Sequence, residues 1–284
     1  MAVVSTGFFD GVHLGHRLVL RTLVGEARRR GEESIVITFW PHPRNVLQNE
    51  ARSLRLLTSL EEKKALMTAL EVDRVEVLPF TKEFASMRAE EYLSLLRERF
   101  GASLVVMGYD NRIGSDGRSA KDFEDSEFVI LSGAVDGADE MPISSTRIRN
   151  ELLEGRIEEA NAMLGYSYSL YGVVVAGNRM GRTIGFPTAN IQLYEPLKLV
   201  PGNGVYAVEV EVNGGFFKGM CNIGTRPTVG GSARTIEVHI LDFSEDIYGL
   251  PLKIRFLRRI RDERKFPSLE ALREQLEKDR RICL

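Results

Sequence analysis

Two histidines and an aspartate lie in a glycine-rich turn near the start of the chain, GFFDGVHLGH at 7–16, directly after the apolar run 2–4. The chain has only 4 histidines, and His13 and His16 are two of them. A strand, a glycine-containing turn and a helix start together present backbone N–H donors and a positive dipole end to an anion. Two imidazoles three residues apart can bind phosphate oxygens and stabilise charge on a leaving pyrophosphate. The turn therefore indicates a phosphate site.

Two plainer interpretations fit the same histidine spacing. A surface turn with two exposed histidines needs no ligand at all. A zinc pair needs at least a third ligand, and none is obvious nearby in the sequence.

A second segment that can bind phosphate is ISSTRIR, at 143–149. Ser144, Ser145 and Thr146 can cap a helix that runs to Glu154. Their hydroxyls, the helix start and Arg149 are then available together as phosphate ligands. For the serine–threonine run alone, a simple helix cap remains the alternative.

Alternating strands and helices position these segments in the first half of the chain. The apolar runs predict short strands at 2–5, 34–39, 75–78 and 104–107. Helical spacing predicts helices at 16–30, from a capping box at Ser59 towards Leu70, and at 89–100. Short apolar strands, each followed by a helix, indicate a parallel sheet covered on both faces, which binds ligands at its carboxyl edge. The turn 7–16 and the segment GYDNRIG at 108–114 both follow such strand ends.

The second half changes to period-two alternation, as at 205–212, 236–240 and 252–256. Such segments between glycine, asparagine and proline turns predict antiparallel strands in a barrel or a sandwich. An amphipathic helix at 268–280 closes the chain. We expect two domains, 1–160 and 161–284, that meet in a helical stretch between 147 and 166.

Composition excludes several classes of protein. The net charge is −2 and 43% of residues are hydrophobic, so we expect a globular protein with no nucleic-acid or membrane partner. Cys221 and Cys283 are far apart and lack CxxC spacing, which excludes a disulfide framework and a cysteine zinc site. The lack of a leader-like segment and of an 18-residue apolar run predicts a cytoplasmic location. The oligomeric state is left open.

The complete opening string resembles the H-x-G-H site of nucleotidyltransferases, and its longer form resembles the adenylyltransferase half of bacterial bifunctional riboflavin kinase/FAD synthetases. The segment TFWPHP at 38–43 resembles the flavin-side loop of that family, and ISSTRIR resembles its I-S-S-T-x-x-R motif. The resemblance implies a Rossmann-like nucleotidyltransferase domain with His13, His16 and Arg149 as catalytic residues. It implies nucleotide binding by Gly7, Phe8, Asp10, Asp110, Ser144, Ser145 and Thr146, and flavin binding by Phe39, His42 and Pro43.

The segment GRTIGFPTAN at 181–190 resembles the riboflavin kinase motif that ends in P-T-A-N, and implies an antiparallel barrel for the second domain. By this resemblance Thr188 and Asn190 place Mg²⁺ and the ATP phosphates, which suits an ion that takes few protein oxygens. Glu237 matches the general base, although an exposed strand carboxylate is the plain alternative. Arg261 contacts flavin by analogy or is a solvated strand end, and His239 is interpreted as a barrel residue. The remaining nucleotide-binding residues implied here are Gly177, Gly181, Thr183 and Gly185.

Together the motifs predict an enzyme that phosphorylates riboflavin with Mg-ATP to FMN, then transfers AMP from ATP to FMN, giving FAD and pyrophosphate. ATP, riboflavin and FMN are the expected partners. One departure concerns Asn111 and Ile113, which stand where the family often has phenylalanine. A riboflavin kinase with an inactive first domain is therefore an alternative. A flavin or nucleotide sensor without turnover is another, and a nucleotidyltransferase for a different acceptor would leave the P-T-A-N segment unexplained.

Overall fold

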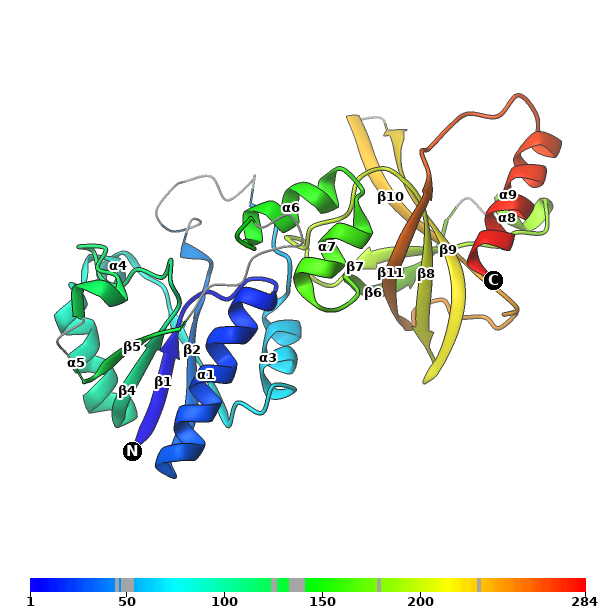
Figure 1. Ribbon diagram of the computed structural model, residues 1–284. Coiled ribbons are helices and arrows are strands. Elements are labelled where there is room, and N and C mark those ends of the chain that lie inside the picture. Colours follow the sequence, from blue (N-terminus) through cyan, green and yellow to red (C-terminus); the bar gives the residue numbers. More distant parts are fainter. Residues whose placement is uncertain (44–45, 47–53, 124–126, 133–140, 178–179, 229–230) are drawn as a thin grey trace. The chain divides into compact units, whose positions relative to one another are not determined.

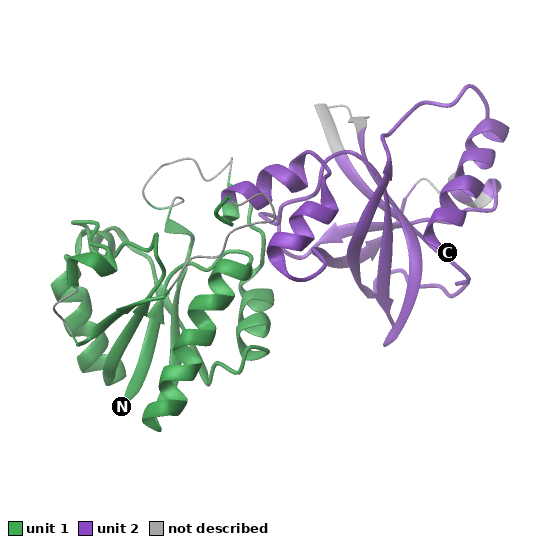
Figure 2. Cartoon of the chain, in the orientation of Figure 1, with its two compact units in different colours: residues 1–145 green, residues 146–284 purple. Residues whose placement is uncertain are grey.

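The computed structural model describes residues 1–43, 46, 54–123, 127–132, 141–177, 180–228 and 231–284. The chain forms two compact units, Met1–Ser145 and Thr146–Leu284, each with its own sheet (Figure 2). The predicted domain boundary after residue 160 stays a prediction. None of the described helices is long and apolar enough to cross a membrane.

The first unit is built on a five-stranded sheet in the order β3-β2-β1-β4-β5. Its strands are β1 (Ala2–Thr6), β2 (Glu33–Trp40), β3 (Arg74–Pro79), β4 (Ala102–Met107) and β5 (Val129–Leu131). All four pairings are parallel, as the apolar strand pattern predicts. Because the chain moves from one side of β1 to the other after β3, the carboxyl ends of β1 and β4 form the switch point where such sheets bind ligands.

Helices cover both faces of this sheet (Figure 1). The helical segments are α1 (Leu14–Arg30), α3 (Leu60–Thr68), α4 (Lys82–Ser86), α5 (Ala89–Phe100) and the 3₁₀ turn η1 (Ala120–Phe123). Successive residues of β1 point to opposite faces. Val3 packs in one core with Leu20 of α1, whereas Val4 packs in the other with Leu96 of α5. The predicted two-sided covering is confirmed.

The ends of the helices follow local capping chemistry. α1 begins at Leu14, two residues before the predicted start, because His13 is its N-cap and its Nδ1 accepts a hydrogen bond from the His16 amide at 3.4 Å. The helix ends at Gly31, whose φ of 67° is left-handed and favours glycine. α3 opens with the predicted capping box, in which Ser59 and Glu62 each accept from the other's amide, at 3.1 and 2.8 Å.

The second unit is a closed antiparallel barrel in the order β10-β7-β6-β11-β8-β9, which decides between the predicted barrel and sandwich. Its strands are β6 (Ser169–Val175), β7 (Ala189–Leu193), β8 (Gly204–Val212), β9 (Gly215–Thr228), β10 (Gly231–Ile240) and β11 (Pro251–Arg261). Its helices are α6 (Ser145–Leu153, from the last residue of the first unit), α7 (Ile157–Leu164), α8 (Met180–Thr183) and the closing α9 (Leu269–Cys283). Full closure leaves the sheet without free edges.

The capping box of α3 gives a stability test. Ser59→Ala removes the acceptor for the Glu62 amide, so we expect unfolding of the first unit to become easier by about 1 kcal/mol in urea titrations. Ser94→Ala, at an exposed position within α5, is the matched control and changes little. Equal stability of the two variants would contradict the role of the cap.

Candidate active sites

The two histidines of the opening turn lie face to face at the start of α1. Their rings stack with centroids 3.6 Å apart and an interplanar angle of 19°. His13 is 5% exposed, and His16 Nδ1 is buried without a hydrogen-bond partner among the described residues. Burial lowers the pKa of His16 well below its usual value, and the neighbouring His13 and Lys63 lower it further. Burial and these two neighbours thus favour the neutral form of His16.

A buried carboxylate holds the turn in an unusual conformation. Phe9, Gly11 and Val12 have backbone φ values of 52°, 82° and 39°. Residues other than glycine rarely adopt this left-handed region. The Asp10 carboxylate accepts hydrogen bonds from the amides of Leu57 and Thr58 at 3.0 and 3.1 Å. Asp10, predicted as a nucleotide ligand, therefore anchors the turn in this structure.

The second predicted phosphate motif, ISSTRIR, contacts the histidine turn at Asp10. The Ser145 hydroxyl donates to the Asp10 carbonyl at 2.9 Å. A Cβ on Gly15 would lie 3.7 Å from the Ile143 carbonyl, so the two backbones run close together. The structure thus brings the histidine turn and the Ile143–Ser145 end of ISSTRIR together, while Thr146 and Arg149 belong to the second unit.

A cavity of about 470 Å³ opens at the switch point of the parallel sheet. Three of its phenylalanines, Phe39, Phe80 and Phe84, pack with ring centroids 5.3–5.7 Å apart. A concave site of this volume with five aromatic side chains in its lining suits a planar ring system. Its lining is Thr6, Gly7, Phe8, Phe39, Pro43, Phe80, Phe84, Ala85, Met87, Tyr92 and residues 111–115.

Four of the residues predicted for this domain, Gly7, Phe8, Phe39 and Pro43, line the cavity. The predicted His42 packs edge-on against Phe8, with ring centroids 4.0 Å apart. Asp110 is exposed and lies outside the lining.

Asn111 and Ile113, which depart from the family pattern, also line this cavity. The Asn111 amide donates to the Thr6 carbonyl at 2.7 Å, and the Thr6 hydroxyl is 2.6 Å from the Tyr92 hydroxyl. Ile113 is buried in the core beneath them. Asn111 therefore links its loop to the end of β1, Ile113 is part of the core, and both residues line the cavity.

Sequence reasoning missed Lys63, a fully buried residue of α3. Its Nζ donates to the Phe8 carbonyl at 2.6 Å and lies 3.6 Å from the centroid of the Phe8 ring. Burial lowers the pKa of Lys63 to about 8, and the Asp10 carboxylate opposes that shift. The spacing Ser59–Lys63–Met67 places the lysine on the buried face of the helix, which is the signal that was available.

The candidate kinase site lies where β7 and β10 pair in the barrel. Asn190 is directly opposite Glu237 in the register, and the Thr188 hydroxyl donates to Glu237 Oε2 at 3.4 Å. A Cβ on Gly177 would be 2.0 Å from the Asn190 amide nitrogen, so only glycine allows this approach. Three predicted residues, Thr188, Asn190 and Glu237, are thus brought together as oxygen donors.

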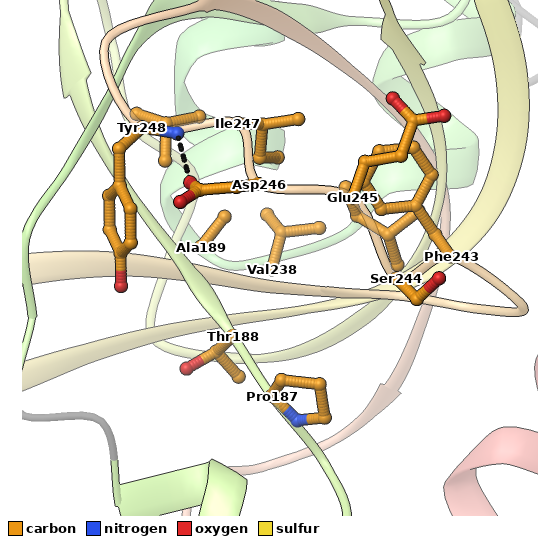
Figure 3. A pocket seen from close by; sticks show the side chains of 12 residues that line it. Pro187, Thr188, Ala189, Val238, Phe243, Ser244, Glu245, Asp246, Ile247 and Tyr248 are labelled. Carbon is orange, nitrogen blue, oxygen red and sulfur yellow. Dashed lines mark hydrogen bonds between the residues drawn. The ribbon is translucent and has the colours of Figure 1, made fainter.

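Two cavities adjoin these residues, and Thr188 lines both. The first, of about 400 Å³, lies between the loop 243–248 and a floor that includes Ala189 and Val238 (Figure 3). The second, of about 320 Å³, contains Glu237, Gly181 and Arg261 and is closed on one side by leucines of α9. The arrangement offers space for two ligands that meet at Thr188.

Arg261, predicted to contact flavin, holds α9 against the barrel. Its Nε and terminal nitrogen lie 2.9 and 2.8 Å from the Asp279 carboxylate, which is fully buried. Gln275 donates to the same carboxylate at 2.7 Å. Arg261 therefore positions the helix whose leucines form the wall of the second cavity.

The other predicted residues of this domain lie in the segment before β7. A Cβ on Gly181 would be 2.1 Å from the Phe186 carbonyl, so the tight turn requires glycine. Gly185 has a φ of 82°, and Thr183 is exposed at the end of α8. His239, interpreted as a barrel residue, lies on β10 with its Nδ1 2.7 Å from the Pro187 carbonyl.

Comparison with known proteins assigns a family model to each half of the chain. Residues 1–151 match the family model described as FAD synthetase, and residues 164–284 match the one described as riboflavin kinase. A parallel nucleotidyltransferase sheet joined to a kinase barrel defines a two-activity enzyme of flavin nucleotide synthesis.

Curated relatives give the particular family. A bifunctional riboflavin kinase/FMN adenylyltransferase of Listeria monocytogenes is 41% identical over 98% of this chain and 90% of its own length. The protein of the same description from Bacillus subtilis is 38% identical, covering 100% of this chain and 92% of its own. This chain belongs to the bifunctional riboflavin kinase/FMN adenylyltransferase family.

A solved structure extends the similarity to the fold. A crystal structure described as a macrolide-efflux protein from Streptococcus pneumoniae superposes with a TM-score of 0.94 at 35% identity, and covers 99% of this chain and 93% of that one. The description of its activity applies to that protein. The family of the present chain follows from the family models and the curated relatives.

The close approach of Gly177 to Asn190 gives a test of the kinase site. Gly177→Ala displaces the Asn190 amide, and we expect riboflavin phosphorylation to fall about 100-fold because misplacement by about 1 Å costs that much. Adenylyl transfer to supplied FMN should stay unchanged. The control Gly25→Ala, in open space on α1, should leave both rates unchanged. Full kinase activity in Gly177→Ala would show that this approach is not required.

Proposed function

We propose that the chain makes FMN and FAD at two separate sites, one in each unit. The observation that carries this proposal is that each unit has its own cavity and its own cluster of side chains able to bind phosphate. In the first unit these are the stacked histidines. In the second they are Thr188, Asn190 and Glu237. We further propose that the two functional domains are 1–160 and 161–284.

Riboflavin is phosphorylated in the barrel. Because Glu237 lines the cavity closed by α9, we assign riboflavin to that cavity and ATP to the one under the loop 243–248. The 5′-hydroxyl oxygen of riboflavin attacks the γ-phosphorus, the bond to ADP breaks, and Glu237 accepts the hydroxyl proton. Gly177 and Gly185, with Thr183, keep the backbone close to the nucleotide. Gly181 lines the riboflavin cavity and shapes the turn before β7. Arg261 contributes by its ion pair with Asp279, which holds α9 as one wall of the riboflavin cavity.

The donor set at this site fits Mg²⁺. The Thr188 hydroxyl and the Asn190 amide supply neutral oxygens beside a carboxylate, the ligands that Mg²⁺ prefers, and the ion shares its remaining positions with phosphate and water. No group of three or more histidine, cysteine or acidic side chains that could hold a metal exists among the described residues. Bound Mg²⁺ would neutralise charge on the phosphates, held by Thr188 and Asn190.

FMN is adenylylated in the first unit. We assign its ring system to the 470 Å³ aromatic cavity, with Phe39, His42 and Pro43 on the flavin side. A phosphate oxygen of FMN attacks the α-phosphorus of ATP and pyrophosphate leaves, so no protein nucleophile is needed. His13 and His16 stabilise the charge that develops on the phosphates. The remaining nucleotide contacts are assigned to Gly7, Phe8, Asp110, Ser144 and Ser145, while Asp10 holds the turn that carries the histidines. Thr146 and Arg149 stay predicted nucleotide contacts from the sequence motif.

One assay tests this assignment. Riboflavin, ATP and Mg²⁺ are incubated with the protein, and the products are separated by chromatography. We expect FMN to appear first and FAD to follow. FMN without FAD would show that the first unit is inactive, and bound flavin without any product would indicate a sensor.

Removal of both imidazoles should separate the activities. His13→Ala combined with His16→Ala should lower FAD formation by at least about 100-fold, because each charge-stabilising donor contributes about that much. FMN formation should continue at the wild-type rate, measured in the same chromatographic assay. Loss of both activities in a folded variant would refute two separate sites.

The converse variant lies in the barrel. Glu237→Gln keeps the size of the side chain but removes the base, so FMN formation should fall about 10²–10⁴-fold. FAD should still form when FMN is supplied, which also serves as the folding control. Unchanged FMN formation would rule out Glu237 as the base.

A further inference from the structure

Lys63 is a buried charge that the proposed chemistry does not yet use. It is only 1% exposed. Its described polar contacts are the Phe8 carbonyl, at 2.6 Å, and the Thr38 hydroxyl, at 3.3 Å. A buried ammonium is costly unless an opposite charge compensates it. No carboxylate forms an ion pair with Lys63 among the residues that the structure describes.

The Lys63 ammonium contacts Phe8 at both its carbonyl and its ring. Lys63 Nζ donates to the Phe8 carbonyl and lies 3.6 Å from the centroid of the Phe8 ring. The Thr38 hydroxyl donates to the same carbonyl at 3.2 Å. Phe8 belongs to the histidine turn and also lines the aromatic cavity. Lys63 therefore contacts both the backbone and the ring of a residue that belongs to the turn and lines the cavity.

The titratable groups around Lys63 come from the turn and from α1. Asp10, in the turn, attracts the ammonium and favours its charged form. The positive charge of Lys63 in turn disfavours protonation of His16, which also faces His13. Thr38, on β2, is neutral. Positive charge at this site is therefore favoured on the buried lysine, and the neutral form is favoured for the imidazole.

We propose that Lys63 is a positioning residue for adenylyl transfer. Its buried ammonium fixes Phe8, a residue of the histidine turn that lines the aromatic cavity, and supplies positive charge for phosphorylated substrates. The inference rests on the proposed adenylyl transfer in the first unit. ATP and FMN both bring phosphate charge to this unit, which compensates the lysine when they bind. The lysine acts through Phe8 and through its electric field, and needs no direct contact with the reacting atoms.

The pH profile of adenylyl transfer tests the charge. FAD formation from supplied FMN and ATP is measured between pH 6.5 and 9.5 for the wild type, Lys63→Met and Lys63→Arg. We expect Lys63→Met to lower kcat/KM about 10–100-fold at pH 7, the effect of losing a hydrogen bond to a charged group. The pKa of Lys63, about 8, predicts that the wild type loses activity as the pH rises through that value. Lys63→Met should show no such fall, and neither should Lys63→Arg, which stays charged.

Two controls separate charge from folding. Lys64→Met alters the adjacent lysine, which is partly exposed and pairs with Glu61, and should leave the whole profile unchanged. Riboflavin phosphorylation in the second unit should be unchanged in every variant. A wild-type profile without a fall near pH 8, or a Lys63→Met variant with wild-type kcat/KM, would overturn the inference. Absence of FAD formation in the wild type would instead refute the proposed function of the first unit.

Discussion

The hydrogen bonds of the buried Asp10 carboxylate are the interaction on which the first unit depends. They hold a turn in which Phe9 and Val12 adopt left-handed conformations, and such strain persists only when surrounding contacts enforce it. With the turn fixed, His13 caps α1 and stacks on His16. The Asp10 carbonyl also accepts a hydrogen bond from the Ser145 hydroxyl, which belongs to a segment far along the chain. One residue, Asp10, thus fixes the turn through its carboxylate and contacts the second phosphate motif through its carbonyl.

In the barrel, the site residues are positioned by a close approach of the Gly177 backbone to the Asn190 side chain. Gly177 leaves room for the Asn190 amide, and the pairing of β7 with β10 sets that amide opposite Glu237. The Arg261–Asp279 ion pair then closes the neighbouring cavity with α9. Because a buried carboxylate without its partner is strongly destabilising, this pair defines where the helix lies. In both units a strand of the sheet therefore carries the site, and hydrogen bonds or an ion pair fix the neighbouring segment: the histidine turn in the first unit and α9 in the second.

Most elements of the fold were predictable from local sequence patterns. The parallel sheet, the capping box at Ser59, the stop at Gly31 and the full extent of α5 were predictable, since periodicity and capping are local properties. The start of α1 was wrong by two residues because a histidine acts as the N-cap, a position that usually holds serine, threonine or aspartate. Barrel and sandwich were indistinguishable in sequence, since both show period-two strands and differ only in closure between β10 and β7.

By itself the sequence determined which segments handle phosphate and flavin, because residue types such as HLGH and PTAN restrict the chemistry. Tertiary structure alone decided how individual side chains serve it. Asp10 is an anchor of the turn, Arg261 is a partner of Asp279, and Asn111 is bonded to the end of β1. Lys63 became visible only through its burial against Phe8. Hydrogen-bond partners and burial depend on residues brought together by the sheet register, and no local pattern encodes them.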